Sequence, residues 1–274
     1  MNHPQVKLIL SDIDGTLQPA GPFTSGPRAI AAFHAAIDAG IHCGGASGRN
    51  LDRVFHSFGF DEACCATAIG SDGMEVCLDG AMVREEFLPL EGVRRAVEVM
   101  RTVPNSFSGV TDGDGYYLIT GSMEGLVKGD PKRFRIHETG GVVPDIRTPK
   151  YNLFLTPDLG LTLDLMARLE AAAPELDFHM ERPGALSATS KGCNKATAVQ
   201  LICDRLGIGL DEVVVFGDSG NDVEMLSYVP NSVAVENASP EAAAAARWHI
   251  GSVDDDAVPA AIEELAAGRW PFVR

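Results

Sequence analysis

Residues 6–17 of the chain read VKLILSDIDGTL, an apolar run that leads directly into two aspartates and a glycine. A short continuous apolar run is typical of a strand buried on both faces of a parallel sheet. Asp12 and Asp14 are two positions apart, so an extended backbone directs both side chains to the same side. The stretch therefore predicts an inner strand that ends in a pair of carboxylates.

Strand and helix patterns alternate on either side of this stretch. Residues 25–40 have apolar positions at helical spacing, residues 41–46 form a second apolar strand, and ACCATAIG (residues 63–70) predicts a third. Near the C-terminus, a helical pattern at residues 194–207 precedes the apolar EVVVF of residues 212–216. Repeated βαβ units predict an α/β fold with a doubly wound parallel-sheet (Rossmann-like) core, which binds ligands at the carboxyl ends of its strands.

The middle of the chain has a different pattern. It contains two helix-like segments, a hairpin-like TDGDGYYLIT (residues 111–120) and an alternating KYNLFLT (residues 150–156). We therefore expect an inserted α+β cap domain over residues 84–185 and a catalytic core formed by residues 1–83 and 186–274. The TDGDG run lacks the acidic spacing of an EF-hand calcium loop, and a tight hairpin turn explains it better.

Composition and net charge argue against several classes of protein. The 274 residues are 45% hydrophobic, which is enough for proper cores. A formal net charge of -16 and a pI near 4.7 argue against a nucleic-acid partner. No apolar run approaches membrane-spanning length and no signal segment is evident, so we expect a cytoplasmic protein without a membrane partner. The six cysteines show no paired CxxC spacing, which favours free thiols, and nothing in the sequence indicates an oligomeric state.

A second acidic cluster follows the late strand EVVVF. The sequence GDSGND places Asp218, Asn221 and Asp222 directly after this strand. Parallel strands deliver their carboxyl ends to one edge of the sheet, where these side chains would meet Asp12 and Asp14. Such a group of carboxylates is costly without a cation, and Mg²⁺ is a hard ion that takes oxygen ligands. The pattern predicts a magnesium site.

The stretch HCGGASGRN (residues 42–50) allows two interpretations. Cys43 and Arg49 have the spacing of the loop in cysteine-dependent phosphatases, whereas Ser47 can instead present a hydroxyl to phosphate at the end of a buried strand. Ala46 stands where the cysteine-phosphatase loop needs a glycine, and a Cys43 nucleophile would leave the aspartates without a role. These two points favour a structural Cys43 and leave the Ser47 hydroxyl as a candidate contact for phosphate.

Four motifs, in this order, resemble those of the haloacid dehalogenase-like hydrolase superfamily, and within it the Cof-type (subclass IIB) sugar-phosphate phosphatases. The motifs are DIDGTL (residues 12–17), SGR (47–49), KGCNKA (191–196) and GDSGNDVEML (217–226). The resemblance covers essentially the whole chain. It implies a phosphoric monoester hydrolase that uses Mg²⁺ to act on a small phosphorylated metabolite, namely a sugar phosphate.

The resemblance also implies roles for individual residues. Asp12 would be the nucleophile that becomes an aspartyl phosphate, and Asp14 the general acid and base. The phosphate-binding residues would be Ser47, Lys195 and Asn221, and the magnesium site would be formed by Asp12, Asp14 through its backbone carbonyl, Asp218 and Asp222. A carboxylate that attacks a phosphate dianion needs neutralising charge nearby, which agrees with a lysine and a metal in this site.

Some positions depart from the family pattern or leave alternatives open. Ser47 stands where the second motif usually has threonine, and Asp72-Gly73 stands where an Asn-Gly pair is common, which puts substrate contacts near that loop in doubt. Lys191 is a rival to Lys195 for the phosphate-binding role. In the cap, the basic run of Lys132, Arg133 and Arg135 either attracts anionic substrates or forms a solvated basic face.

Other functions compete with a phosphatase. A phosphomannomutase-like enzyme would return the phosphoryl group to the substrate instead of water. Dehalogenation has no alkoxide leaving group to protonate and would leave Asp14 unnecessary. A non-catalytic sugar-phosphate sensor or protein-binding module is disfavoured by the intact set of Asp12, Asp14, Lys195 and Asp218.

Overall fold

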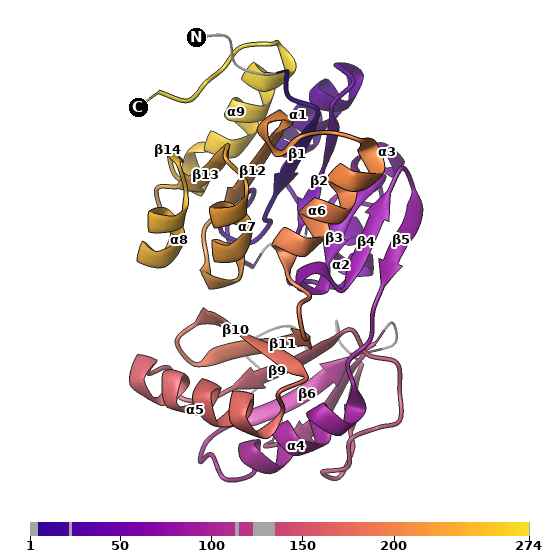
Figure 1. The fold of residues 1–274 in the computed structure, drawn as a ribbon, viewed down its shortest axis with the longest axis vertical. Coiled ribbons are helices and arrows are strands. Elements are labelled where there is room, and N and C mark those ends of the chain that lie inside the picture. The colour runs from indigo at the N-terminus through magenta and orange to yellow at the C-terminus, as the bar shows by residue number, and fades with distance from the viewer. Residues whose placement is uncertain (1–4, 22–23, 113–114, 123–134, 274) are drawn as a thin grey trace. The chain divides into compact units, whose positions relative to one another are not determined.

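The structure is a computed structural model that describes residues 5–21, 24–112, 115–122 and 135–273. The chain divides into two compact units, which are described separately. The first comprises Met1–Glu85 and Asn194–Arg274, and the second comprises Glu86–Cys193 (Figure 1). The second unit is thus a single insertion between two segments of the first.

A mostly parallel sheet forms the centre of the first unit. Within the described residues it has eight strands in the order β14-β13-β12-β1-β2-β3-β4-β5. The strands from β14 to β3 run parallel, and β4 and β5 add an antiparallel edge that the sequence did not predict. The bounds are β1 (Leu8–Ser11), β2 (His42–Ala46), β3 (Thr67–Gly70), β4 (Glu75–Leu78), β5 (Ala81–Glu85), β12 (Val213–Gly217), β13 (Ser232–Val235) and β14 (Trp248–Ile250).

Helices cover both faces of this sheet (Figure 1). Alternate residues of β1 point to opposite faces, so that Ile9 packs in one core with Phe33 and Ile262, while Leu10 packs in the other with Val199 and Met225. The helices of the first unit are α1 (Pro27–Asp38), α2 (Leu51–Ser57), α3 (Glu62–Cys65), α6 (Lys195–Leu206), α7 (Val223–Tyr228), α8 (Pro240–Ala245) and α9 (Ala257–Ala266). The doubly wound α/β core predicted from the sequence is confirmed.

The third predicted strand begins later than the sequence indicated. Ala63, Cys64 and Cys65 belong to α3, and β3 starts only at Thr67. The reason is local, because the Asp61 side chain accepts a hydrogen bond from the Cys64 backbone N–H at 3.0 Å and so caps a short helix. An apolar run alone does not distinguish a buried strand from a helical turn.

The second unit is built on its own sheet. Within the described residues, this sheet has six strands in the order β10-β11-β9-β6-β7-β8, antiparallel except between β7 and β8. The strands are β6 (Phe107–Thr111), β7 (Tyr116–Thr120), β8 (Ile136–Glu138), β9 (Lys150–Phe154), β10 (Leu176–Arg182) and β11 (Ala185–Ser190), and the helices are α4 (Leu90–Met100) and α5 (Leu159–Ala172). β6 and β7 pair across residues 112–115, as expected of a hairpin.

The boundaries between the units differ from the expected ones. We expected the insertion to cover residues 84–185, whereas it covers residues 86–193. The larger difference arises from β11, which the sequence placed in the core. β11 pairs with both β9 and β10 and is therefore an inner strand of the second unit's sheet.

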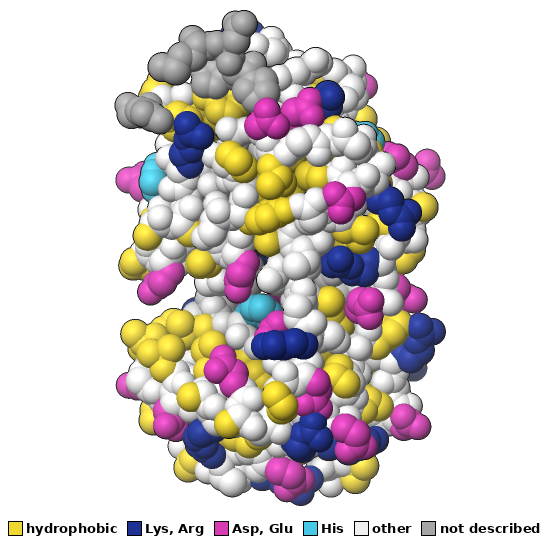
Figure 2. Space-filling view, in the orientation of Figure 1, with side chains coloured by type: hydrophobic (Ala, Val, Ile, Leu, Met, Phe, Trp, Pro, Cys, Tyr) yellow, Lys and Arg dark blue, Asp and Glu magenta, His cyan; other side chains and the backbone are white. Residues whose placement is uncertain are grey.

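Charged side chains of both signs are mixed on the face of the molecule that Figure 2 shows. On the face shown in Figure 2, lysine and arginine side chains are interspersed with acidic ones. In the described part of the chain, every helix is too short or too polar to cross a membrane.

Candidate active site

Two neighbouring strands deliver the central aspartates. The Asp12 backbone N–H donates to the Phe216 carbonyl at 2.9 Å, which extends the parallel pairing of β1 with β12 by one residue. Asp218 follows β12 in the same way. The carboxylate oxygens of Asp12, Asp218 and Asp222 lie within 4.8 Å of one another, so the strand ends bring together three of the predicted metal ligands.

Lys195 lies at the centre of this cluster. Its ammonium donates to Asp12 Oδ1 at 2.7 Å and to Asp222 Oδ1 at 2.6 Å, and its side chain is fully buried. Burial lowers the pKa of Lys195, but the carboxylates of Asp12 and Asp222 outweigh this effect and raise the pKa above its usual value. Lys195 is therefore a buried cation. It is the first residue of α6, whose start is fixed by a capping box between Asn194 and Thr197.

One ammonium does not balance the negative charge around it. Burial raises the pKa of Asp12 well above its usual value, with Asp222 and Asp218 adding to the rise and Lys195 opposing it. Burial and the Asp222 carboxylate raise the pKa of Asp218 to about 6. A further positive charge nearby would stabilise the ionised form of these buried carboxylates.

The donor set fits a hard divalent cation. Asp218 Oδ1 accepts from the Thr16 hydroxyl at 2.5 Å, and Asp12 Oδ1 is held by Lys195, so that Oδ2 of each remains available within the described residues. Both oxygens of Asp222 are already engaged, because Oδ1 binds Lys195 and Oδ2 accepts from the backbone N–H groups of Asp218 and Ser219 at 3.1 Å. Asp222 thus fits a supporting position better than a direct ligand position. Mg²⁺ prefers oxygen ligands of this kind.

Gly15 allows the first motif to approach Asp218. Its backbone φ is +90°, and a Cβ atom at this position would lie 2.7 Å from Asp218 Oδ2. A larger residue would therefore be strained and would also press on the acidic cluster.

The Asp14 side chain does not join the three-carboxylate cluster. Arg49 binds both of its oxygens, with Nε 2.7 Å from Oδ2 and Nη2 2.5 Å from Oδ1, and Arg49 Nη1 donates to the Ser57 hydroxyl at 2.7 Å. From the sequence, Arg49 had no predicted role apart from the rejected cysteine-phosphatase loop. Its position in the SGR motif was a signal, but the partner of its guanidinium could not be read from the motif.

The predicted phosphate-binding residues Ser47 and Asn221 are linked through the loop after β3. Ser47 is buried at the end of β2, and its carbonyl accepts from the Asp72 backbone N–H at 3.1 Å. Asn221 Nδ2 donates to Asp72 Oδ1 at 2.8 Å, while Asn221 Oδ1 accepts from the Ser219 hydroxyl at 2.6 Å. Asp72 has a left-handed backbone with φ 54°, which asparagine and aspartate tolerate better than most residues. Asp72 is therefore a buried carboxylate at the site, and its contact with Asn221 was not predicted from the sequence.

Other candidates lie elsewhere. Lys191, the rival to Lys195, belongs to the second unit and forms an ion pair with Asp177. Of the two lysines, it is Lys195 that contacts Asp12. Cys43 is buried in β2, and burial raises the pKa of its thiol well above the usual value, which opposes a thiolate nucleophile. Lys132 and Arg133 of the predicted basic run lie outside the described residues.

Comparison with known proteins places this arrangement in context. A family model described as haloacid dehalogenase-like hydrolase matches residues 9–262. The HMP-PP phosphatase of Yersinia pseudotuberculosis is 26% identical over 252 residues, which cover 86% of this chain and 85% of the relative.

Solved structures share the fold. SMU.1108c from Streptococcus mutans UA159 superposes with a TM-score of 0.85 at 23% identity, over 96% of this chain and 99% of that chain. The HAD subclass IIB sugar phosphatase BT4131 superposes with a TM-score of 0.78 at 20% identity, over 94% of this chain and 98% of that chain. These matches confirm the predicted fold class.

Proposed function

Because this chain belongs to the haloacid dehalogenase-like hydrolases and is a phosphatase of the Cof type, we propose that it hydrolyses a sugar phosphate through a phosphorylated Asp12 with Mg²⁺ as cofactor. One observation carries this proposal. A buried, positively charged Lys195 is held between Asp12 and Asp222 at 2.7 Å and 2.6 Å, with Asp218 beside them. This arrangement can neutralise both an attacking carboxylate and an incoming phosphate.

In the first half-reaction, an oxygen of Asp12 forms a bond to phosphorus, and the bond between phosphorus and the sugar oxygen breaks. Asp14 donates a proton to the leaving oxygen, so that the products are an aspartyl phosphate on Asp12 and a neutral sugar alcohol. Lys195 donates to Asp12 in the resting state and is close enough to contact phosphoryl oxygens bound beside it.

In the second half-reaction, Asp14 as a carboxylate takes a proton from water, and the water oxygen forms a bond to phosphorus. The bond between phosphorus and Asp12 breaks, which releases inorganic phosphate and restores the Asp12 carboxylate. Arg49 fixes the Asp14 carboxylate by two hydrogen bonds and keeps it oriented for both proton transfers.

The metal and the remaining polar groups would hold the phosphate. Mg²⁺ bound by Asp12, Asp218 and the Asp14 carbonyl, with Asp222 in support, would supply positive charge that offsets the phosphate charge. The Ser47 hydroxyl and the Asn221 amide would donate to phosphoryl oxygens. Asn221 can keep its contact with Asp72, because its amide nitrogen carries a second N–H, and Lys195 can likewise remain in place.

The proposed substrate class rests on the relatives. BT4131 is a sugar phosphatase of subclass IIB and shares this fold, while the Yersinia relative is an HMP-PP phosphatase. We propose that the substrate is a sugar monophosphate and not a nucleic acid, because the net charge of -16 disfavours the binding of polyanions. We further propose a cytoplasmic, reducing compartment, because none of the six cysteines, all of which the structure describes, is in a disulfide.

A metabolite screen with a nucleophile variant tests the proposal. We expect Mg²⁺-dependent release of phosphate from sugar phosphates, lost with a chelator. Asp12→Asn should lower turnover by more than roughly 10⁴-fold, while Cys43→Ser retains it. Acid quenching of the wild-type enzyme with labelled substrate should place the phosphoryl group on Asp12. Label on Cys43, or undiminished turnover by Asp12→Asn, would reject the mechanism, and activity only in the presence of a sugar bisphosphate would indicate a mutase.

A further inference from the structure

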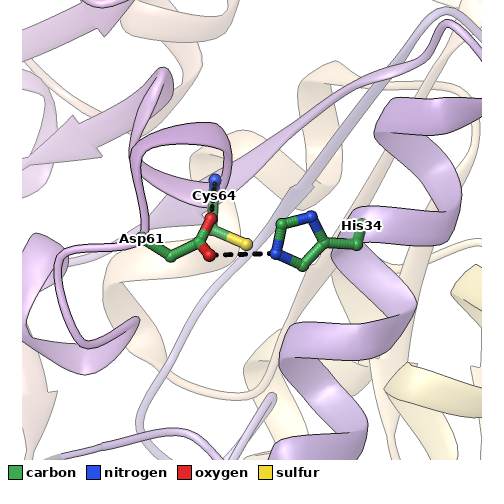
Figure 3. A group of neighbouring side chains, drawn as sticks. All are labelled: His34, Asp61 and Cys64. Atoms are coloured by element: carbon green, nitrogen blue, oxygen red, sulfur yellow. Dashed lines mark hydrogen bonds and ion pairs between the residues drawn. The ribbon is translucent and has the colours of Figure 1, made fainter.

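A second group of side chains with metal-binding atoms lies outside the proposed active site. His34 projects from α1, Asp61 immediately precedes α3, and Cys64 lies within α3. Figure 3 shows the three side chains pointing toward one another from these two elements. None of the three has a part in the proposed phosphatase mechanism.

The three donor atoms are spaced closely enough to share one ion. His34 Nε2 is 3.0 Å from Asp61 Oδ2, and one ligand atom from each residue lies within 4.8 Å of the others. Ligands at zinc bond lengths of about 2.0–2.3 Å in a tetrahedron are about 3.4 Å apart. The His34 and Asp61 atoms would open slightly from 3.0 Å, and the sulfur of Cys64, already within 4.8 Å of both, would need only a small shift for the three to occupy three corners of a tetrahedron.

The carboxylate is already fixed by the fold. Asp61 Oδ1 accepts from the Cys64 backbone N–H at 3.0 Å, which leaves Oδ2 directed at His34. An ion could replace the contact between Asp61 Oδ2 and His34 without disturbing the cap of α3. The site is thus partly preorganised by a hydrogen bond that metal binding would not break.

We propose that His34, Asp61 and Cys64 bind a borderline-soft divalent cation of the zinc class, with water as its fourth ligand. The donor set combines an imidazole nitrogen, a carboxylate oxygen and a sulfur, which suits zinc and not magnesium. One carboxylate and one thiolate together neutralise the divalent charge. The bound ion would join α1 to α3 and stabilise the core, and it would take no part in phosphate transfer.

Access and proton balance are compatible with this site. The side chains of His34 and Asp61 are 42% and 32% exposed, so an ion can approach from solvent although Cys64 is buried beneath them. Burial, with the Asp61 carboxylate adding to its effect, raises the pKa of the Cys64 thiol to about 12. The metal–sulfur bond therefore forms as the S–H bond breaks, and the proton is released to solvent.

Cobalt(II) provides a direct test, because a cobalt–thiolate bond gives a near-ultraviolet charge-transfer band that oxygen ligands do not give. The reduced full-length protein is titrated with cobalt(II) in excess Mg²⁺, which occupies the proposed active site. We expect one equivalent of cobalt to produce the band, and zinc to abolish it by displacement. The band should disappear in Cys64→Ser and persist in Cys65→Ser, a matched change in the adjacent half-buried cysteine.

A second variant keeps the test decisive if Cys64→Ser folds poorly. His34 is partly exposed, so His34→Gln should fold normally and retain Mg²⁺-dependent phosphate release. Zinc should raise the melting temperature of the wild type and raise that of His34→Gln much less. The proposal is overturned if folded wild type gives no thiolate band, if the band survives in Cys64→Ser, or if zinc stabilises wild type and His34→Gln equally.

Discussion

At the scale of single residues, the guanidinium of Arg49 holds both oxygens of the Asp14 carboxylate, and Ser57 holds the guanidinium in turn. A planar guanidinium matches the two oxygens of a carboxylate, which an ammonium cannot do. Arg49 is therefore a positioning residue for the proposed acid and base.

Arg49→Lys tests this role by keeping the charge and removing the paired hydrogen bonds. We expect kcat for an alkyl phosphate to fall about 10-fold to 100-fold, because Asp14 is no longer held in its proton-transfer position. The first step with an aryl phosphate, whose leaving group scarcely needs a proton, should be affected much less. Ser57→Ala, which removes only one contact of Arg49, is the control and should change kcat by a few-fold at most. An equal loss with both substrates and a raised KM would place Arg49 in phosphate binding instead.

Asp14→Asn separates the two half-reactions. With a chromogenic aryl phosphate, Asp12 should still be phosphorylated, because the leaving phenolate is stable without a proton. Hydrolysis of the aspartyl phosphate should be slow, because the asparagine cannot take a proton from water. Rapid mixing should therefore show a burst approaching one equivalent of phenol, followed by slow turnover. A sugar phosphate should give no burst, and wild-type turnover of alkyl phosphates by this variant would disprove the role.

The candidate site was predictable where it depended on strand ends. Asp12 and Asp218 follow apolar strands, and adjacent parallel strands bring such residues together. The pairing of Arg49 with Asp14 and of Asn221 with Asp72 depends on side-chain directions in loops, for which a sequence pattern has no periodicity. The contact between Lys195 and Asp12 likewise could not be read from the sequence pattern alone, because Lys191 and Lys195 both lie near one helix start.

At the scale of elements, buried strands were predicted well where a short continuous apolar run ends directly in polar and glycine residues. β1 and β12 are examples. The edge strand β5 and its neighbour β4 were missed, and β5 lacks such a run because it is largely exposed. α3 was mistaken for strand because a single capping carboxylate, Asp61, determined its conformation.

Glu75 links β4 to α2 through a hydrogen bond, and its pKa predicts how the stability of the protein depends on pH. At the start of β4, its Oε2 accepts from the Ser71 hydroxyl at 2.6 Å and from the Leu51 N–H of α2 at 3.2 Å. Burial raises the pKa of Glu75 above its usual value, although these hydrogen bonds oppose the rise. The folded protein then binds this proton more tightly than the unfolded chain does. This tighter binding adds to the free energy of unfolding at pH values below the usual glutamate pKa. The added free energy is lost as the pH rises through the raised pKa of Glu75 in the folded protein.

Glu75→Gln should remove this part of the pH dependence. Urea unfolding from about pH 4 to about pH 8 should show the stability of the wild type falling relative to that of the variant as the pH rises. Glu241→Gln, at an exposed position in the first turn of α8, should follow the wild type. Parallel curves for the wild type and Glu75→Gln would show that Glu75 has the same pKa in both states.

At the scale of the whole molecule, the second unit is one continuous segment with its own sheet, which predicts that it folds when excised. A fragment of residues 86–193 should give a cooperative urea transition by circular dichroism. A fragment of residues 84–185 should not, because it lacks almost all of β11, which lies between β9 and β10. If the two fragments unfold alike, β11 is dispensable and the unit boundary is misplaced.

The position of the insertion also determines the order in which the molecule can be completed during synthesis. Leu8 of β1 lies beside Val213 of β12, although one strand leaves the ribosome near the beginning of translation and the other near its end. At about 5–20 residues per second, the intervening stretch of roughly 200 residues takes roughly 10–40 s to make. For most of that interval the nascent chain carries Asp12 without Lys195, and throughout it the apolar strand β1 has one open edge. The insertion can fold during the delay, so the nascent protein can have a folded second unit before the proposed active site is complete, and chaperones that shield β1 would have this period in which to act.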